Sequence, residues 1–171
     1  MSRGRAPIRA SGEFTATEHE SLRLWLRLLN CSSLVERQVR ARLRGEFGIT
    51  LPRFDLLAQL DAAAREGAKG LTMSELSRRL MVTNGNLTGL VERLVQEELV
   101  SRVVSPTDRR TQIVRLTTQG KRVLLSMTPA HEEWIESMFA ETSAEERAQL
   151  FALLGRLRES IRSALVSEVE E

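Results

Sequence analysis

Small polar side chains gather in one short segment, TNGNLTG at residues 83–89. Asn84, Asn86 and Thr88 carry amide and hydroxyl groups, which can hydrogen-bond to base edges in the major groove of DNA. A helix that only faces water would favour Glu, Lys and Ala at these positions. The residue types therefore indicate a surface that reads a nucleic acid. The alternative is a loosely built helix beside a turn.

Two glycines in the same segment support the first interpretation. Gly85 and Gly89 lie four residues apart, so on a helix they share one face. A glycine inside a helix costs roughly 1 kcal/mol relative to alanine. Two such costs on one exposed face suggest that a bulky partner approaches the backbone, and a major groove, which admits one helix, fits this requirement.

Two predicted helices must position this face. Thr72 and Glu75 form a capping box, so we expect the first helix to begin at Thr72. Its apolar residues are spaced three and four apart: Met73, Leu76 and Leu80. Thr83 can cap the second helix. Four residues of that helix recur at helical spacing and should face the core: Leu87, Leu90, Val91 and Leu94.

A predicted β-hairpin follows the two helices. The runs Leu99–Ser105 and Thr111–Leu116 are apolar and β-branched, and Pro and Asp in the segment between them suit a turn. Arg109 and Arg110 would lie at its tip, where they suit a phosphate backbone or a narrow minor groove. An ordinary solvated turn would be the better interpretation if the hairpin did not follow a helix-turn-helix.

Residues 71–116 resemble the winged helix-turn-helix of MarR-type transcriptional regulators. The resemblance rests on three segments in order: MSELSRRLMVTNGNLTGLVERLVQEELV, then DRR at 108–110, then VRLTTQGKRVL. It implies that Arg110 enters the minor groove and that Asp108 is the acidic residue that steadies it. The other predicted DNA-binding residues are Thr72, Ser74, Thr83, Asn84, Asn86, Thr88, Arg93 and Arg109.

Composition bounds the class of protein. The chain has 171 residues, of which 42% are hydrophobic, so we expect one domain, or one domain with a helical extension. No apolar run reaches the length of a membrane span. The N-terminal residues are basic but no apolar stretch follows them, so we expect no signal peptide. These features predict a cytoplasmic protein without a membrane partner.

Charge is distributed unevenly along the chain. Residues 1–71 and residues 72–122 each carry a net charge of +4, whereas residues 123–171 carry −6. A basic reading segment and an acidic C-terminal segment are typical of a nucleic-acid-binding protein with a separate end that does not touch DNA.

The long first helix predicts a partner subunit. A capping box at Thr17 and Glu20 should begin it, and Gly48 should end it after Phe47. Its first half is apolar almost all round, so it must be buried on more than one side. The apolar residues of this half are Leu22, Leu24, Trp25, Leu26, Leu28 and Leu29.

The C-terminal segment predicts further helices. Thr117 should cap a helix that Pro129 kinks, and Ser143 with Glu146 should cap the last one. The last helix carries an apolar seam that would pack against a partner or, alternatively, inside the core: Leu150, Leu154, Leu157, Ile161 and Leu165.

The predicted fold is mainly α with a small β-hairpin wing. A winged helix-turn-helix domain at 51–117 would lie between long dimerisation helices at 17–50 and 118–171, after a mobile basic tail at 1–16. We expect a homodimer that binds a palindromic double-stranded DNA operator.

The resemblance also implies a small-molecule effector. MarR-type proteins usually release DNA when a small aromatic acid or similar ligand enters a pocket beside the dimer helices. Residues 22–60 resemble the regulators that respond to hydroxycinnamates or their CoA thioesters. Arg23, Arg27 and Arg40 would then bind an anion, although Arg23 and Arg27 share a polar stripe that could simply face water. The expected cavity is lined by Trp25, Leu29, Phe54 and Trp134.

Other chemistry is not expected. His19 and His131 lack a second ligand at a useful spacing, so we expect no metal. No phosphate-binding glycine loop or nucleophile–base pair is present, which predicts no cofactor and no enzyme activity. Two alternatives remain. One is a winged-helix protein–protein module, and the other is redox sensing through Cys31, for which a packed, inert thiol is the better interpretation.

Overall fold

The computed structural model describes residues 16–105, 108 and 111–167, and it leaves out the side chains of residues 16–18, 84 and 165–167. The predicted tail therefore lies outside the description except for residue 16. The elements, in order, are α1 (Ala16–Phe47), α2 (Leu51–Arg65), β1 (Leu71–Thr72), α3 (Met73–Leu80), α4 (Asn84–Gln96), β2 (Val100–Val104), β3 (Gln112–Leu116), α5 (Thr118–Met138) and α6 (Ala144–Ser167). The predicted fold class, mainly helical with a small β wing, is confirmed.

The sheet has three antiparallel strands in the order β1-β3-β2. Val100 pairs with Leu116 and Val104 with Gln112, so β2 and β3 form the predicted hairpin. The sequence did not predict β1, which pairs Leu71 with Val114. Gly70 leads into it with a φ of +126°, and a Cβ there would lie 2.6 Å from the Val114 carbonyl oxygen. A glycine is therefore required where the chain enters the sheet.

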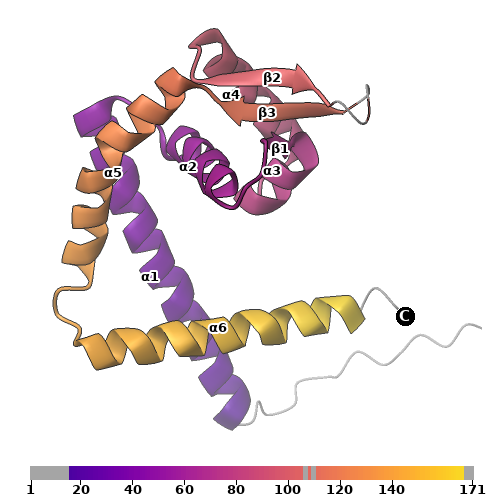
Figure 1. Cartoon of the computed structure of the whole chain (residues 1–171). Helices are drawn as coiled ribbons and strands as arrows, with labels where there is room; N and C mark the ends of the chain where they lie inside the picture. The colour runs from indigo at the N-terminus through magenta and orange to yellow at the C-terminus, as the bar shows by residue number, and fades with distance from the viewer. Residues whose placement is uncertain (1–15, 106–107, 109–110, 168–171) are drawn as a thin grey trace, which may run out of the picture.

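The core lies in the winged unit, where α2, α3 and α4 gather against the sheet (Figure 1). Leucine and valine side chains fill it because the helical and strand periodicities of these segments place their apolar faces together. The largest side chains with almost no exposed surface are Leu43, Leu56, Leu57, Leu60, Leu76, Leu87, Val91, Leu94, Val100, Val114 and Met127.

The first helix ends as predicted but begins earlier. Gly48, with a φ of +64°, closes it by donating its N–H to the Arg44 carbonyl oxygen at 3.2 Å. The helix begins at Ala16, so Thr17 lies inside it instead of at the N-cap. The predicted boundary is wrong by one residue, which is the usual uncertainty of a helix end.

Two helices of the chain leave apolar side chains exposed. In the first half of α1 the exposed fractions run from 39% for Leu28 to 63% for Leu24. In α6 the same is true of Leu150, Phe151, Leu153, Leu154, Leu157 and Ile161. The alternative that α6 is an internal core helix is therefore wrong for a single chain. Both surfaces lie at the end of the molecule away from the winged unit (Figure 1).

α5 continues through its proline. Pro129 lies inside the helix, which runs without interruption from Thr118 to Met138, so the alternative of a break is excluded. The ribbon changes direction along its length (Figure 1), in agreement with the predicted kink. Ser143 and Glu146 form the predicted capping box before α6, with the Glu146 carboxylate accepting from the Ser143 N–H at 2.8 Å.

The start of α5 packs directly on the turn that follows α4. The Thr117 hydroxyl accepts from the Gly120 N–H at 2.9 Å, as predicted for a cap, and it donates to the Glu98 carbonyl oxygen at 2.7 Å. The Leu99 carbonyl oxygen accepts from the Thr117 N–H at 3.1 Å. A Cβ on Gly120 would lie 2.0 Å from that oxygen, so only glycine allows the approach.

We expect Gly120→Ala to destabilise the fold by more than about 2 kcal/mol, although alanine is the better helix former. The backbone of Leu99 would have to move, and that movement would disturb both α4 and β2. Urea unfolding followed by circular dichroism measures the change. Gly45→Ala is the matched control, because no heavy atom lies within 4 Å of a Cβ there. A Gly120→Ala protein as stable as the parent would contradict the tight contact.

Candidate nucleic-acid interface

The helix-turn-helix is built by local hydrogen bonds. The Thr72 hydroxyl accepts from the Glu75 N–H at 3.2 Å, and the Glu75 carboxylate accepts from the Thr72 N–H at 2.7 Å. These bonds confirm the capping box, and the bond from the Thr72 N–H lowers the pKa of Glu75 most. Met81 then adopts the left-handed conformation, and the Ser77 hydroxyl donates to the Val82 carbonyl oxygen at 2.6 Å. This tight turn sets the direction in which α4 leaves α3.

α4 has one buried and one exposed face. Leu87, Val91 and Leu94 are buried as predicted, and Leu90 is half-buried. Thr83 occupies the N-cap position, but its side chain makes no capping hydrogen bond. The exposed residues on or beside α4 include five that the sequence singled out: Thr83, Gly85, Asn86, Thr88 and Gly89. Asn84 begins the helix, and its side chain lies outside the description.

The glycines of α4 face open space. No heavy atom lies within 4 Å of a Cβ built on Gly85 or on Gly89. Packing within the chain therefore does not explain why either residue is a glycine. The open space leaves room for the predicted approach of a partner to the α4 backbone, and it is equally compatible with the alternative of a loosely built helix beside a turn.

The other predicted DNA-binding residues on or next to α3 and α4 differ in how exposed their side chains are. Ser74 on α3 and Arg93 on α4 are exposed. Thr72 is half-buried, and its hydroxyl also donates to the Glu75 carboxylate at 2.8 Å. Thr72 therefore has a structural role at the helix start besides any contact with DNA.

The wing turn is closed by Asp108. The Ser105 N–H donates to the Thr111 carbonyl oxygen at 2.8 Å, and the Thr111 hydroxyl donates to the Asp108 carboxylate at 2.7 Å. The Thr111 N–H also donates to the Asp108 carbonyl oxygen at 3.0 Å. Arg109 and Arg110, the predicted tip contacts, lie outside the described residues.

One arginine links the wing to α4, and the sequence did not predict it. Arg102 of β2 directs its guanidinium to the Thr88 carbonyl oxygen, with 3.5 Å between the nitrogen and the oxygen. The contact joins β2 to the first half of α4. It depends on how β2 lies across α4, and no local pattern around residue 102 signals it.

The predicted ligand-binding residues fall into separate groups. Phe54 and Trp134 are buried, and His131 lies between them, with ring centroids 4.6 Å from Phe54 and 6.3 Å from Trp134. The Arg42 guanidinium lies over the Trp134 ring at 5.6 Å. Because Trp25 precedes Arg42 by 17 positions, about 25 Å of helix separates them. The prediction that all four line one cavity is therefore wrong within a single chain.

A second group of predicted ligand-binding residues lies on the first half of α1, away from Phe54 and Trp134. Arg23 and Arg27, with Asn30 and Cys31, line an open depression on this helix, and Leu29 and Trp25 are exposed there as well. Cys31 is exposed, so the expectation of a packed thiol is wrong for a single chain. The apolar residues of α1 around it are likewise exposed among the described residues.

Arg40 belongs to neither group. It forms an ion pair with Glu36, one turn earlier on α1. Asp55 of α2 is close enough to feel both charges. The pKa of Asp55 is raised to about 6, mainly by burial and to a smaller extent by the charge of Glu36, while Arg40 opposes the shift. An anion held by Arg40 would have to compete with Glu36.

Comparison with known proteins identifies relatives over most of the chain. Residues 47–111 match the model of the MarR family. The chain is 30% identical over 141 residues to the HTH-type transcriptional repressor YetL of Bacillus subtilis, covering 82% of each chain. It is 32% identical over 116 residues to YdgJ, an uncharacterized HTH-type transcriptional regulator of the same organism, covering 68% of each.

A solved structure agrees with the fold. Sco3205, a MarR family transcriptional regulator from Streptomyces coelicolor, was crystallised in complex with DNA. It matches with a TM-score of 0.73 and 25% identity, covering 90% of this chain and 92% of that one. The exposed polar helix beside a β wing defines the winged-helix class. Together with these relatives, it shows that the chain belongs to the MarR family of DNA-binding transcriptional regulators.

None of the helices described is long and apolar enough to cross a membrane. Among the same residues, no three His, Cys, Asp or Glu side chains gather in a way that could hold a metal ion.

We expect Asp55→Asn to stabilise the protein near pH 8 by about 1 kcal/mol, a value discounted for partial exposure. The pKa of Asp55 is about 6 in the folded chain and 3.8 ordinarily, so folding takes up a proton between these values. Stability is therefore lost as pH rises through this window, and the loss is complete above it. Urea unfolding near pH 4 and near pH 8 should show a gain that shrinks at the lower pH. An equal gain at both would contradict the titration.

Proposed function

We propose that this protein is a ligand-responsive transcriptional repressor that binds a palindromic operator as a homodimer. Its proposed effector is a small aromatic acid or the CoA thioester of one. The observation that carries the DNA-binding part is the exposed face of α4, where small uncharged polar residues accompany two glycines that face open space. Such a face costs helix stability, and close contact with a major groove gives it a use.

The reading mechanism follows from the positions of the residues. Asn84, Asn86 and Thr88 would contact base edges from the first turns of α4. The wing would add minor-groove and backbone contacts through Arg109 and Arg110. Asp108 supports this role because it closes the wing turn through Thr111. The other predicted DNA-binding residues would contact phosphates, and such contacts fix the position of the protein on the duplex without reading its sequence. These residues are Thr72, Ser74, Thr83 and Arg93.

The proposed dimer rests on the exposed apolar surfaces of α1 and α6. Contiguous apolar side chains of this extent mark an interaction site. A two-fold interface covers the same surface on both subunits, so one set of residues suffices for both. The two α4 helices would then meet half-sites about one helical turn apart.

The repressor role and the effector have separate support. YetL, which matches along most of the chain, is named a repressor. An aromatic acid suits the resemblance of residues 22–60 to regulators that respond to hydroxycinnamates or their CoA thioesters. The rings of Phe54, His131 and Trp134 beside Arg42 also offer stacking surfaces next to a cation.

We expect Gly89→Ala to stabilise the fold by up to about 1 kcal/mol while weakening operator binding. The added methyl group meets nothing in the free protein, but it would meet DNA at a closely approached backbone. The operator is first recovered by selection from random oligonucleotides. Fluorescence anisotropy then measures the affinity of each protein for that operator.

We expect Thr88→Ala to weaken operator binding by on the order of 1–3 kcal/mol and to relax sequence preference, which the same measurement shows.

Gly45→Ala is again the control, since it should stabilise α1 without changing DNA affinity. If Gly89→Ala binds the operator as tightly as the parent, α4 does not present this face to DNA. If the parent selects no DNA at all, the chain acts as a protein–protein module and the proposed function fails.

We expect the protein in solution to have about twice the chain mass by light scattering at micromolar concentration. Leu154→Glu, on the exposed apolar face of α6, should convert it to a monomer because a buried unpaired carboxylate is costly. Arg158→Glu on the same helix is the matched control, because its side chain is 72% exposed. A parent protein that runs as a monomer would reject the dimer.

A further inference from the structure

The turn between α3 and α4 contains a methionine in a conformation that methionine rarely adopts. Met81 follows α3 with a φ of +53° and a ψ of +39°, in the left-handed region. A residue in this conformation closes many helices, and it is usually a glycine because a Cβ is disfavoured there. Local hydrogen bonds fix the turn, since the Ser77 carbonyl oxygen accepts from the N–H groups of both Met81 and Val82. A side chain is therefore present where glycine would fold with less strain.

The Met81 side chain is almost fully exposed to solvent. It is 92% exposed, whereas Leu80 before it and Val82 after it are half-buried and pack against the core. A strained backbone and an exposed apolar side chain both oppose folding. A partner that covers the side chain would offset both costs.

The surroundings of Met81 favour a polyanion as that partner. Residues 76–91 contain two arginines and no Asp or Glu. Arg78 is exposed, and Arg79 pairs with Glu66 at 3.1 Å. The exposed polar face of α4 follows directly in sequence, while the exposed apolar surfaces of α1 and α6 lie at the other end of the molecule (Figure 1). Met81 thus continues the face proposed for DNA and not the face proposed for the dimer.

We propose that Met81 reads a thymine in each half-site of the operator, with its thioether packed against the C5-methyl group of that base. This inference rests on the proposed function and adds an apolar contact to the polar contacts of α4. Met81 lies three residues before Asn84, so their Cα atoms are at most about 11 Å apart. With α4 in a major groove about 12 Å wide, Met81 lies at the rim of that groove.

The chemistry of the groove selects the partner group. The thymine methyl is the apolar group that the bases present in the major groove. Methionine suits a contact from the rim, because its three rotatable bonds and its polarisable sulfur let it follow an irregular surface. The side chain would therefore distinguish thymine from cytosine, which has no methyl group at this position.

The first test separates the strain from the contact. We expect Met81→Gly to raise the midpoint of thermal unfolding by about 1–3 °C, because relief of the left-handed strain outweighs the added freedom of the unfolded chain. The same variant should weaken operator binding about three- to tenfold by fluorescence anisotropy, since the buried apolar contact is lost. Unchanged or tighter operator binding by Met81→Gly overturns the inference.

Glu98→Gly is the matched control, because Glu98 closes α4 as Met81 closes α3. It is exposed and has a φ of +58°, and the Leu99 N–H after it donates to the Leu94 carbonyl oxygen at 2.9 Å. This substitution removes the same kind of strain, so it should raise the unfolding midpoint by a similar amount.

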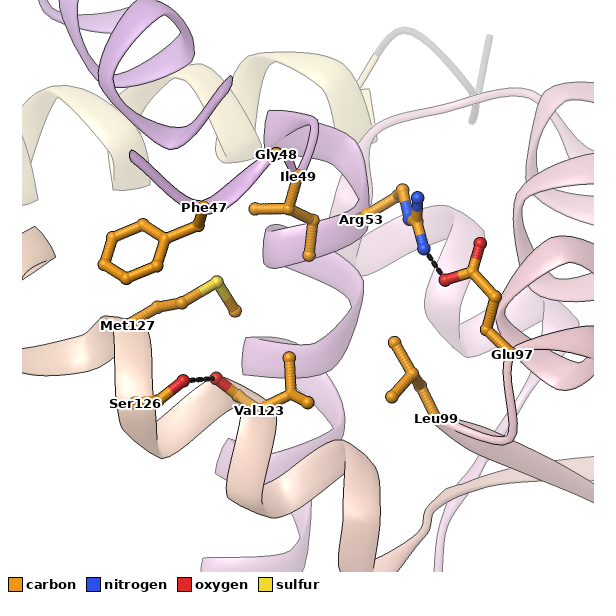
Figure 2. Close-up of a pocket in the computed structure, with 9 residues that line it drawn as sticks. All are labelled: Phe47, Gly48, Ile49, Arg53, Glu97, Leu99, Val123, Ser126 and Met127. Atoms are coloured by element: carbon orange, nitrogen blue, oxygen red, sulfur yellow. Dashed lines mark hydrogen bonds and ion pairs between the residues drawn. The ribbon is translucent and has the colours of Figure 1, made fainter. Parts of the chain in front are cut away.

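Glu98 lies at the end of α4 away from Met81. Its neighbours Glu97 and Leu99 line a cavity of about 240 Å³, where Glu97 forms an ion pair with Arg53 of α2 (Figure 2). α4 is about 20 Å long, so an exposed charge at this end is largely screened from DNA bound at the other. Operator affinity of Glu98→Gly should therefore stay within about twofold of the parent. An equal loss in both glycine variants overturns the contact by Met81.

Two substitutions that keep a side chain at this position test whether the contact is apolar. Met81→Leu should bind the operator within about threefold of the parent, whereas Met81→Gln, similar in length but polar, should lose about as much as Met81→Gly. A role confined to the turn predicts that Leu and Gln behave alike, since both strain the backbone. Equal operator affinities of these two variants therefore overturn the apolar contact. Circular dichroism establishes that each variant is folded.

The last test identifies the base. Deoxyuridine replaces each thymine of the operator in turn, which removes the C5-methyl group and keeps the hydrogen-bonding groups of the base. At one position in each half-site the replacement should weaken binding by the parent about threefold and leave binding by Met81→Gly unchanged. The absence of such a position overturns the inference, even if Met81→Gly binds weakly.

The same measurements distinguish failure of this inference from failure of the proposed function. Operator binding that weakens in Thr88→Ala but in none of the Met81 variants leaves the proposed function standing and overturns the inference alone. A parent protein that selects no DNA shows that the proposed function is wrong, and the inference fails with it.

Discussion

The contact between the Leu99 carbonyl group and the first turn of α5 holds the two parts of this chain together. That oxygen accepts from the Thr117 N–H and lies where any side chain on Gly120 would collide with it. Because Leu99 links α4 to β2, the same contact fixes α4, the wing and the start of α5 relative to one another. Asp61 of α2, buried and 3.6 Å from the Lys121 ammonium, adds an ion pair between α2 and the same turn of α5. Few degrees of freedom remain for α4 once these contacts are made.

The local parts of the fold could be predicted from the sequence because their signals are local. Each capping box predicts a helix start from only four consecutive residues. The structure contains the hydrogen bonds of both boxes, Thr72 with Glu75 and Ser143 with Glu146. The strand β1 was missed because two residues carry no alternation that could be recognised. It exists only because Gly70 lets the chain reach the edge of β3.

The candidate site likewise has local features that the sequence predicted and long-range contacts that it did not. The polar face of α4 was predictable because its residues are neighbours in sequence, whereas the arginine contacts to α4 and to its C-cap join distant segments. Arg102 reaches Thr88 across 14 positions, and Arg53 reaches Glu97 across 44. From the sequence alone, neither arginine can be distinguished from an ordinary surface residue. Grouping Trp25 with Trp134 failed for the related reason that both are aromatic, while a long rigid helix keeps them apart.

The separation of charge gives the molecule a direction. The winged unit carries the basic segment, and the second half of α5, which holds Glu132, Glu133 and Glu136 and no basic residue, lies away from it (Figure 1). The net charge is only +2, so the overall attraction to DNA is weak, and the uneven distribution of charge matters most when the duplex is close. A nearby duplex therefore exerts a torque as well as a pull, and it turns the winged unit toward itself before the surfaces touch. Encounters that begin with the acidic half of α5 facing the phosphates are repelled, so fewer collisions are wasted in the wrong orientation.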